Sequence, residues 1–134
     1  MKQCLLITPR VDNLWVRAIR RSLSRLCWEP KIVEDREISS IRWGNVGLVI
    51  LDAVVTKDLT SLISAIRARD PLVRIVVFSS VDDWKRAREA ILAGAVDFAV
   101  KCLDEEQIVD ILTKDLLQKV PPVAITTSEV RGVS

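Results

Sequence analysis

Histidine is absent from this chain of 134 residues, and cysteine is scarce. The absence of histidine excludes catalytic triads and metal sites that use imidazole, as well as histidine general bases. The three cysteines, Cys4, Cys27 and Cys102, are odd in number and far apart in the sequence. This pattern argues against a disulfide framework and against a zinc site.

Glycine is also rare, with four residues in the chain, and none of them forms a loop that could cradle a phosphate. The sequence therefore argues against a nucleotide site. No apolar run approaches the roughly 20 residues that a membrane-spanning helix needs. The apolar stretch from Cys4 to Ile7 is shorter than the core of a signal peptide, and Pro9 and Arg10 follow it. We therefore expect a cytoplasmic protein with no membrane partner.

Charge of neither sign dominates, because 20 basic residues stand against 18 acidic ones. This balance is too weak to indicate nucleic acid or a membrane surface as a partner. Four arginines share one face of an expected helix, and a solvated basic face is the simpler interpretation; docking of an acidic partner is the alternative. These are Arg17, Arg20, Arg21 and Arg25. The chain has no cluster of stacking aromatic residues, so we expect no nucleic-acid binding by this domain.

Apolar runs and helix-like segments alternate five times along the chain. The runs predict strands at residues 4–7, 31–33, 46–51, 75–78 and 98–100. Helices are predicted from about residue 13, between residues 35 and 43, along an apolar stripe from Leu59 to Ile66 that Asp70-Pro71 closes, from near Asp82-Asp83 to Gly94, and from Asp104. The segment between 35 and 43 has the weakest helical pattern. In the fourth helix, the pattern places four residues toward the core: Trp84, Ala87, Ile91 and Leu92.

The runs at 46–51 and 75–78 are apolar throughout, which is typical of strands covered on both faces in a parallel sheet. Together with the strict alternation, this predicts an α/β fold. We expect a three-layer flavodoxin-like sandwich with five parallel strands in the order 2-1-3-4-5 and five helices. The domain should span residues 1–118, and residues 119–134, with Pro121-Pro122, should form a flexible tail or linker stub.

Polar side chains end three of the apolar runs. They are Asp52, Ser79 and Lys101, and in the expected strand order Thr8 joins them at the same edge. A carboxylate can attack a phosphoryl group, a hydroxyl can bond its oxygens, and an ammonium can balance its charge. A flavin site on this edge is an alternative, but the segment after the first strand lacks the hydroxyl-rich character that FMN requires.

In the order and spacing of three segments, the chain resembles the receiver domain of bacterial response regulators over roughly residues 3–118. These segments are residues 46–52, 75–80 and 93–101. The resemblance implies that Asp52 is the phospho-acceptor, Ser79 the switch hydroxyl, Phe98 the switch aromatic and Lys101 the phosphate-contacting lysine. It also implies a histidine kinase or phosphotransfer protein as partner. Output, or a homodimer, would use the face of the fourth helix, fifth strand and fifth helix.

The chain departs from the receiver pattern where two adjacent acids normally hold magnesium, because these positions read Pro9-Arg10. Proline offers no ligand and a guanidinium repels the ion, so Asp52 alone would bind magnesium weakly or not at all. We expect no other cofactor. One hypothesis is that Arg10 replaces the metal by pairing with Asp52 or with a phosphate, and the alternative is that it points into solvent.

The rims of the site also differ from the receiver pattern. The loop after Asp52, including Val54, is unusually apolar, and Cys102 replaces the proline that commonly follows the lysine. A trans peptide bond is expected at Lys101-Cys102.

Two functions remain open: a receiver that accepts phosphate on Asp52, and a pseudo-receiver that acts as a protein–protein interaction module without phosphorylation. In neither case do we expect an enzyme.

Overall fold

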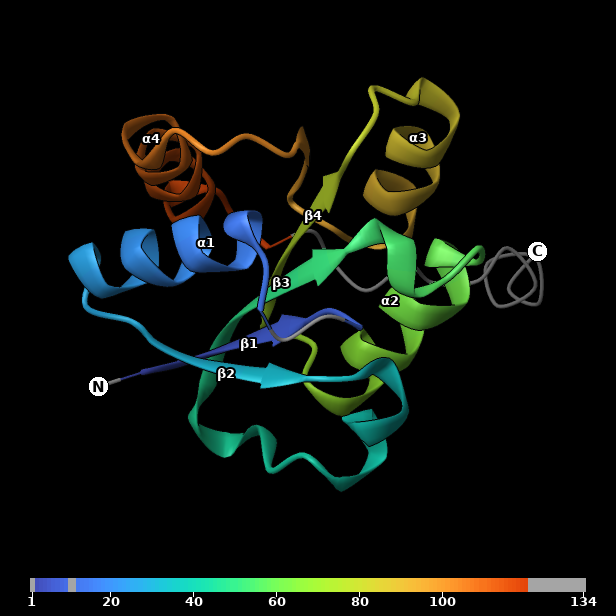
Figure 1. Ribbon diagram of the computed structural model, residues 1–134. Coiled ribbons are helices and arrows are strands. Elements are labelled where there is room, and N and C mark those ends of the chain that lie inside the picture. The colour runs from blue at the N-terminus through green and yellow to red at the C-terminus, as the bar shows by residue number, and fades with distance from the viewer. Residues whose placement is uncertain (1, 10–11, 121–134) are drawn as a thin grey trace, which may run out of the picture.

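The fold is built on one sheet of five parallel strands (Figure 1). The computed structural model describes residues 2–9 and 12–120. The strands are β1 (Gln3–Ile7), β2 (Glu29–Val33), β3 (Val46–Asp52), β4 (Arg74–Ser79) and β5 (Asp97–Val100). Their order is β2-β1-β3-β4-β5, which confirms the order expected from the sequence.

Within the described residues, three α-helices connect strands and a fourth follows β5, and shorter 3-10 helices lie between β2 and β3 and directly after β3. The α-helices are α1 (Leu14–Arg25), α2 (Leu59–Arg69), α3 (Trp84–Ala93) and α4 (Glu105–Leu117). The helix expected between residues 35 and 43 is a 3-10 helix, η1 (Asp35–Ser40), followed by a single turn, η2 (Trp43–Asn45). Ile38 is the buried residue of η1, so this segment lacks the apolar stripe that would hold a longer helix. The fourth and fifth expected helices are therefore α3 and α4.

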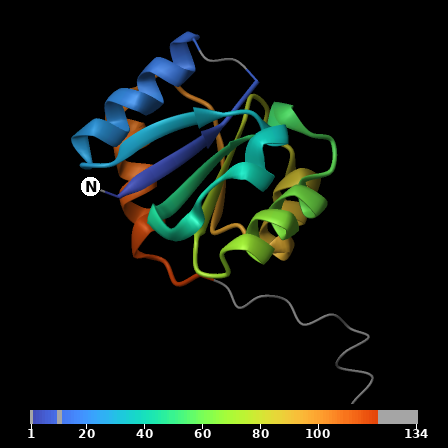
Figure 2. The ribbon, with the colours of Figure 1, turned by 90° about the horizontal axis from the view of Figure 1, so that it is seen from below.

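The helices form two layers, with α1 and α4 on one face of the sheet and α2 and α3 on the other (Figure 2). Alternate residues of the central strand β3 enter the two cores. Val49 and Leu51 pack in the core that includes α2, and Leu48 and Ile50 pack in the core that includes α1 and α4. Because β3 is apolar on both faces, it lies in the middle of the sandwich and carries Asp52 to the edge.

The inward face of α3 differs from the sequence prediction. Trp84 is 67% exposed, Ile91 45% and Leu92 67%, whereas Ala90 is fully buried. The prediction that these three large residues face the core is wrong, because α3 approaches its neighbours through the small side chain of Ala90. Its ends are as expected: Asp83 accepts hydrogen bonds from two amides of the first turn, and Gly94 ends the helix with φ of 117°.

No helix within residues 2–9 and 12–120 is long and apolar enough to cross a bilayer. The last helix, α4, ends at Leu117, and the domain boundary expected at residue 118 stays a prediction. The predicted tail falls mostly on residues 121–134, which lie outside the described residues.

Candidate functional site

Asp52 is buried at the carboxyl end of β3, with 2% of its surface exposed. Its oxygen Oδ2 accepts a hydrogen bond from the Thr8 hydroxyl at 2.9 Å. Its oxygen Oδ1 lies 2.9 Å from the Lys101 ammonium and accepts the backbone N–H of Val54 at 3.2 Å. Three donors therefore surround one buried carboxylate. Two of them, the Thr8 hydroxyl and the Lys101 ammonium, belong to residues that follow other strands.

The strand order explains how these distant residues meet. β1 lies beside β3, so Thr8, which follows β1, reaches Asp52 across one strand spacing. β5 lies beyond β4, and the Lys101 N–H donates to the Ser79 carbonyl at 2.7 Å. This bond continues the ladder past the end of β5 and holds Lys101 at the same edge as Asp52. The structure thus brings together Thr8, Asp52 and Lys101, as the strand order predicts.

Ser79 is placed beside this cluster without a described bond to Asp52. It is 5% exposed, and its Oγ accepts the Val81 N–H at 3.3 Å. Its hydroxyl is therefore part of the turn after β4 in this structure. Phe98 is half-buried and packs against the core on the α2 side. Both residues remain candidates for switching, since neither is locked into the Asp52 contacts.

The rim of the site is formed by residues of the loops after β1 and β3. Val54 is 66% exposed and Pro9 is exposed, so both residues reach the solvent at this rim. Arg10 lies outside the described residues, and its proposed contact with Asp52 stays a hypothesis. The loop after Asp52 therefore exposes an apolar side chain, that of Val54, to solvent.

Trp15 is a site residue that sequence reasoning missed. The Lys101 ammonium lies 4.5 Å from the centre of its indole ring, and the ring is 5% exposed. A cation over a shielded tryptophan face is attracted by the ring's electron density. Lys101 thus lies between the carboxylate of Asp52 and the face of Trp15. A tryptophan in the first turn of a helix is typical of a core residue, and no sequence signal indicates a cation above it.

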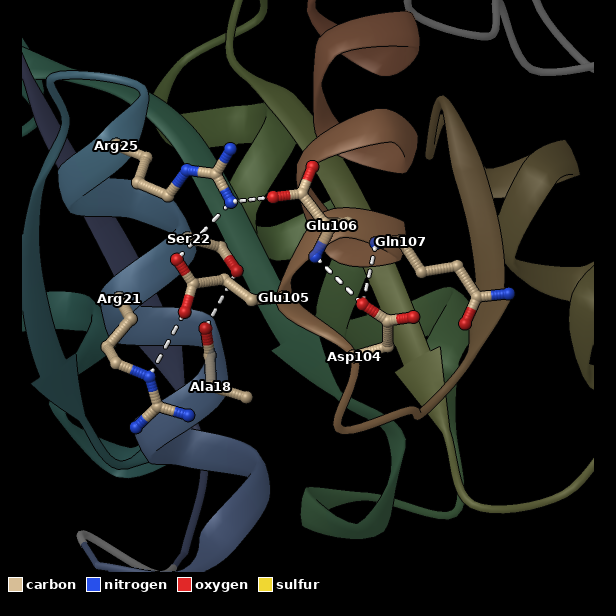
Figure 3. A network of polar contacts seen from close by, with 8 residues as sticks. All are labelled: Ala18, Arg21, Ser22, Arg25, Asp104, Glu105, Glu106 and Gln107. Atoms are coloured by element: carbon tan, nitrogen blue, oxygen red, sulfur yellow. Dashed lines mark hydrogen bonds and ion pairs between the residues drawn. The ribbon is translucent and has the colours of Figure 1, made fainter.

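The loop that carries Lys101 ends at α4, and α4 is tied to α1 at its first turn (Figure 3). Arg21 donates to Glu105 at 3.2 Å, and Arg25 donates to Glu106 at 2.7 Å and to Glu105 at 3.4 Å. Asp104 caps the helix by accepting the amides of Glu106 and Gln107, as Figure 3 also shows. The exposed pairs are individually weak, but together they fix the far end of the Lys101 loop against the helix that carries Trp15.

The basic face of α1 is thereby largely matched by acids of this chain. Besides the pairs of Arg21 and Arg25, Arg17 donates to both carboxylate oxygens of Asp12, at 2.8 and 3.0 Å. These bonds and the positive charge of Arg17 lower the pKa of Asp12. Asp12 is thus engaged at the surface, and Asn13 caps α1 by accepting the Val16 N–H at 2.8 Å.

In the receiver pattern, two adjacent acids after the first strand hold magnesium. The described residues of this chain do not fit that ion. Magnesium prefers a near-octahedral set of oxygen ligands. The pocket offers the Asp52 carboxylate and the Thr8 hydroxyl, and the Lys101 ammonium already holds the carboxylate. Within residues 2–9 and 12–120, no three acidic or cysteine side chains gather as a metal-binding group. The site is therefore balanced by an internal cation.

Cys102 follows Lys101 through a trans peptide bond, as the sequence predicts; the described part of the chain contains no cis bond. The Cys102 side chain is half-buried and packs against the core of α1 and α4. Its sulfur lies 3.9 Å from the Asp104 carbonyl. These contacts indicate that the Cys102 thiol contributes to packing beside the site.

No protein-family model and no curated protein matches the sequence. Solved structures do match the fold. A response regulator from Thermotoga maritima superposes with a TM-score of 0.75 at 18% identity, covering 88% of this chain and 99% of its own. HP1043, an orphan response regulator of H. pylori, gives 0.69 at 20% identity, covering 86% and 96%. A response regulator protein from Burkholderia pseudomallei, solved with a phosphorylated aspartic acid and a calcium ion, gives 0.66 at 20% identity, covering 99% and 72%.

These similarities show that the chain has the fold of a response-regulator receiver domain. Asp52 lies at the edge formed by the carboxyl ends of the strands, which is where an open parallel sheet binds its ligands. At these identities the likeness concerns the fold, and the chemistry of the site rests on its own residues.

Proposed function

We propose that this receiver-like domain works in signal transduction as a protein–protein interaction module, with Asp52 held in a standing ion pair with Lys101. The observation that carries the proposal is the set of three donors that the described residues place around Asp52: the Thr8 hydroxyl, the Val54 amide and the Lys101 ammonium. A carboxylate satisfied in this way needs neither a metal nor a phosphoryl group to be stable. Such a module acts by contact rather than by turnover.

The surface that we assign to contact is formed by α3, β5 and α4. It carries large apolar side chains that are exposed to solvent, since Leu92 is 67% exposed, Val100 43% and Leu103 55%. Trp84 at the start of α3 is 67% exposed as well. Exposed apolar side chains that gather on one face mark interaction sites, and tryptophan is a frequent anchor of protein interfaces. A second copy of the chain is the partner to test first.

Sedimentation velocity at increasing protein concentration tests this assignment. Leu92→Glu should abolish concentration-dependent self-association, because it places a charge in the apolar interface. Leu72→Glu is the matched control, because Leu72 is 78% exposed in the turn between α2 and β4 and belongs to none of the three elements of this face. Equal effects of the two substitutions, or a wild-type monomer at every concentration, would refute a homodimer through α3, β5 and α4.

The second candidate function is phosphate acceptance on Asp52 from a histidine kinase or phosphotransfer protein. The gathering of Asp52, Lys101 and Ser79 at one edge favours it, and the Burkholderia pseudomallei protein of similar fold carries a phosphorylated aspartic acid. In that reaction an Asp52 oxygen attacks the phosphorus of a phosphohistidine. The new O–P bond forms as the N–P bond breaks, and the histidine nitrogen leaves with the electron pair. Lys101 would then transfer its contact from the carboxylate to a phosphoryl oxygen.

Intact-mass measurement after incubation with acetyl phosphate and magnesium separates the two candidates. The interaction module should keep its mass, because Lys101 occupies the carboxylate and no three acidic or cysteine side chains of the described residues gather to hold the metal. A phosphoryl adduct that disappears in Asp52→Asn would establish the acceptor and overturn the module. Asp52→Asn is the appropriate control, since it keeps the size of the side chain and removes the nucleophile.

A further inference from the structure

Arg86 joins α3 to the loop that follows Asp52. Its Nη1 donates to the Ala53 carbonyl at 3.1 Å, and its Nη2 donates to the Thr56 carbonyl at 2.6 Å. The side chain is half-buried, so these bonds are partly shielded from water. The two nitrogens of one planar guanidinium thus hold two carbonyls on either side of a single turn.

The turn that Arg86 holds is the one that contacts Asp52. It is the 3-10 helix η3 (Ala53–Val55), which begins directly after Asp52. Its middle residue, Val54, donates its N–H to Asp52 Oδ1, the same oxygen that faces Lys101. A shift of this turn therefore changes the donors at Asp52, and a change at Asp52 shifts the turn.

α3 packs against α2 and β5 mainly through small side chains. Ala90 is its one buried residue within the described helix, and the partly buried Ala93 packs against the same core, while its larger apolar residues are exposed. An alanine buries little apolar surface, so each of these contacts contributes little. The bonds of Arg86 therefore add a directional attachment between α3 and the loop after Asp52.

We propose that Arg86 is a positioning residue that couples the state of Asp52 to the placement of α3. Loss or replacement of the Asp52 contacts moves the turn at Ala53–Val55, and Arg86 transmits this movement to the helix. The coupling rests on the proposed function in treating α3 as part of the contact face. It requires no phosphate, because any change of the donors around Asp52 is sufficient.

Hydrogen exchange measured by mass spectrometry tests the coupling as a double-mutant cycle. Asp52→Ala removes the acceptor of the Val54 N–H, and it should accelerate amide exchange in α3 by roughly threefold when Arg86 is present. The same substitution in an Arg86→Gln background should leave exchange in α3 nearly unchanged relative to Arg86→Gln alone. Arg88→Gln is the matched control, since Arg88 is an exposed arginine of the same helix, and it should preserve the acceleration.

Equal acceleration with and without Arg86 would overturn the proposal, as would an unaltered α3 in Asp52→Ala itself. If Arg86→Gln does not fold, Arg86→Lys replaces it, because an ammonium keeps the charge but cannot span both carbonyls. Loss of the acceleration in Arg86→Lys supports the coupling, and its retention contradicts it. The cycle uses no phosphoryl donor and no self-association, so its outcome is separate from the tests of the proposed function.

Discussion

The ammonium of Lys101 closes the pocket over Asp52, with Nζ 2.9 Å from Oδ1. The side chain of Asp52 is 3% exposed and that of Lys101 is 19% exposed, so the pair is largely withdrawn from water. Removing one partner of such a pair leaves an uncompensated charge in a poorly solvated place. The pair is therefore a structural element of this edge as well as its chemical centre.

Trp15 should stabilise the Lys101 ammonium specifically. We predict that Trp15→Phe costs about 1 kcal/mol more in the wild-type protein than in a Lys101→Met background, because the smaller ring attracts the cation less. Urea unfolding of the four proteins measures this difference, and the cycle cancels the packing that Trp15 loses in both backgrounds. Equal costs in the two backgrounds would mean that the contact of 4.5 Å has no energetic role.

Replacing Pro9 and Arg10, which follow β1, by acidic residues should create a magnesium site. We predict that Pro9→Asp with Arg10→Asp raises the affinity for magnesium by about tenfold, since two carboxylates join Asp52 as oxygen ligands. Isothermal titration calorimetry measures the affinity. The same pair of substitutions in an Asp52→Asn background should gain much less. No gain in the Asp52 protein would contradict the view that the Pro9-Arg10 sequence is what disfavours the metal.

The strands and the polar edge were predictable from the sequence, and the contacts between helices and edge were not. The apolar runs before Asp52 and Ser79 are typical of buried strands in a parallel sheet, which predicts the strand order. The carboxyl ends of such strands lie at one edge of the sheet, which predicts where the polar residues meet. Trp84, Ile91 and Leu92 were assigned to the wrong side of α3, because helical spacing cannot tell which stripe packs when the true contact is an alanine. Arg86 and Trp15 were missed since an arginine on a helix normally indicates solvent and a tryptophan normally indicates core.

Asp115, at the opposite end of the molecule from Asp52, should make stability depend on pH. It is fully buried in α4, and among the described residues no donor reaches its oxygens. The carboxyl group of Asp97, at the start of β5, becomes its hydrogen-bond partner when one of the two carboxyl groups carries a proton. Burial, followed by this bond and the charge of Asp97, raises the pKa of Asp115 from 3.8 to about 8, against the opposing charge of Lys114.

The sign follows from proton binding. Between about pH 4 and 8 the folded protein keeps the proton of Asp115, while the unfolded chain releases it. The free energy of unfolding should therefore fall as the pH rises through this window, by at most about 1.4 kcal/mol per pH unit for one proton. Urea unfolding at several pH values should show this slope in the wild type and a flatter profile in Asp115→Asn.

Asp110→Asn serves as the control for Asp115, because Asp110 is an exposed acid of the same helix. Its profile should follow that of the wild type. Asp97→Asn should lower the pKa of Asp115 by removing the neighbouring negative charge. The pH range over which the free energy of unfolding falls should then end at a lower pH than in the wild type. A wild-type slope that persists in Asp115→Asn would assign the proton to another group.

The coupling energy between Asp52 and Lys101, measured by urea unfolding, tests the central claim most directly. The four proteins are the wild type, Asp52→Asn, Lys101→Met and the double variant. Lys101→Met alone should cost about 3 kcal/mol, because the buried carboxylate loses its cation. In the Asp52→Asn background the same substitution should cost less than about 1 kcal/mol. Costs that agree within about 0.5 kcal/mol in the two backgrounds would contradict a standing ion pair at this site.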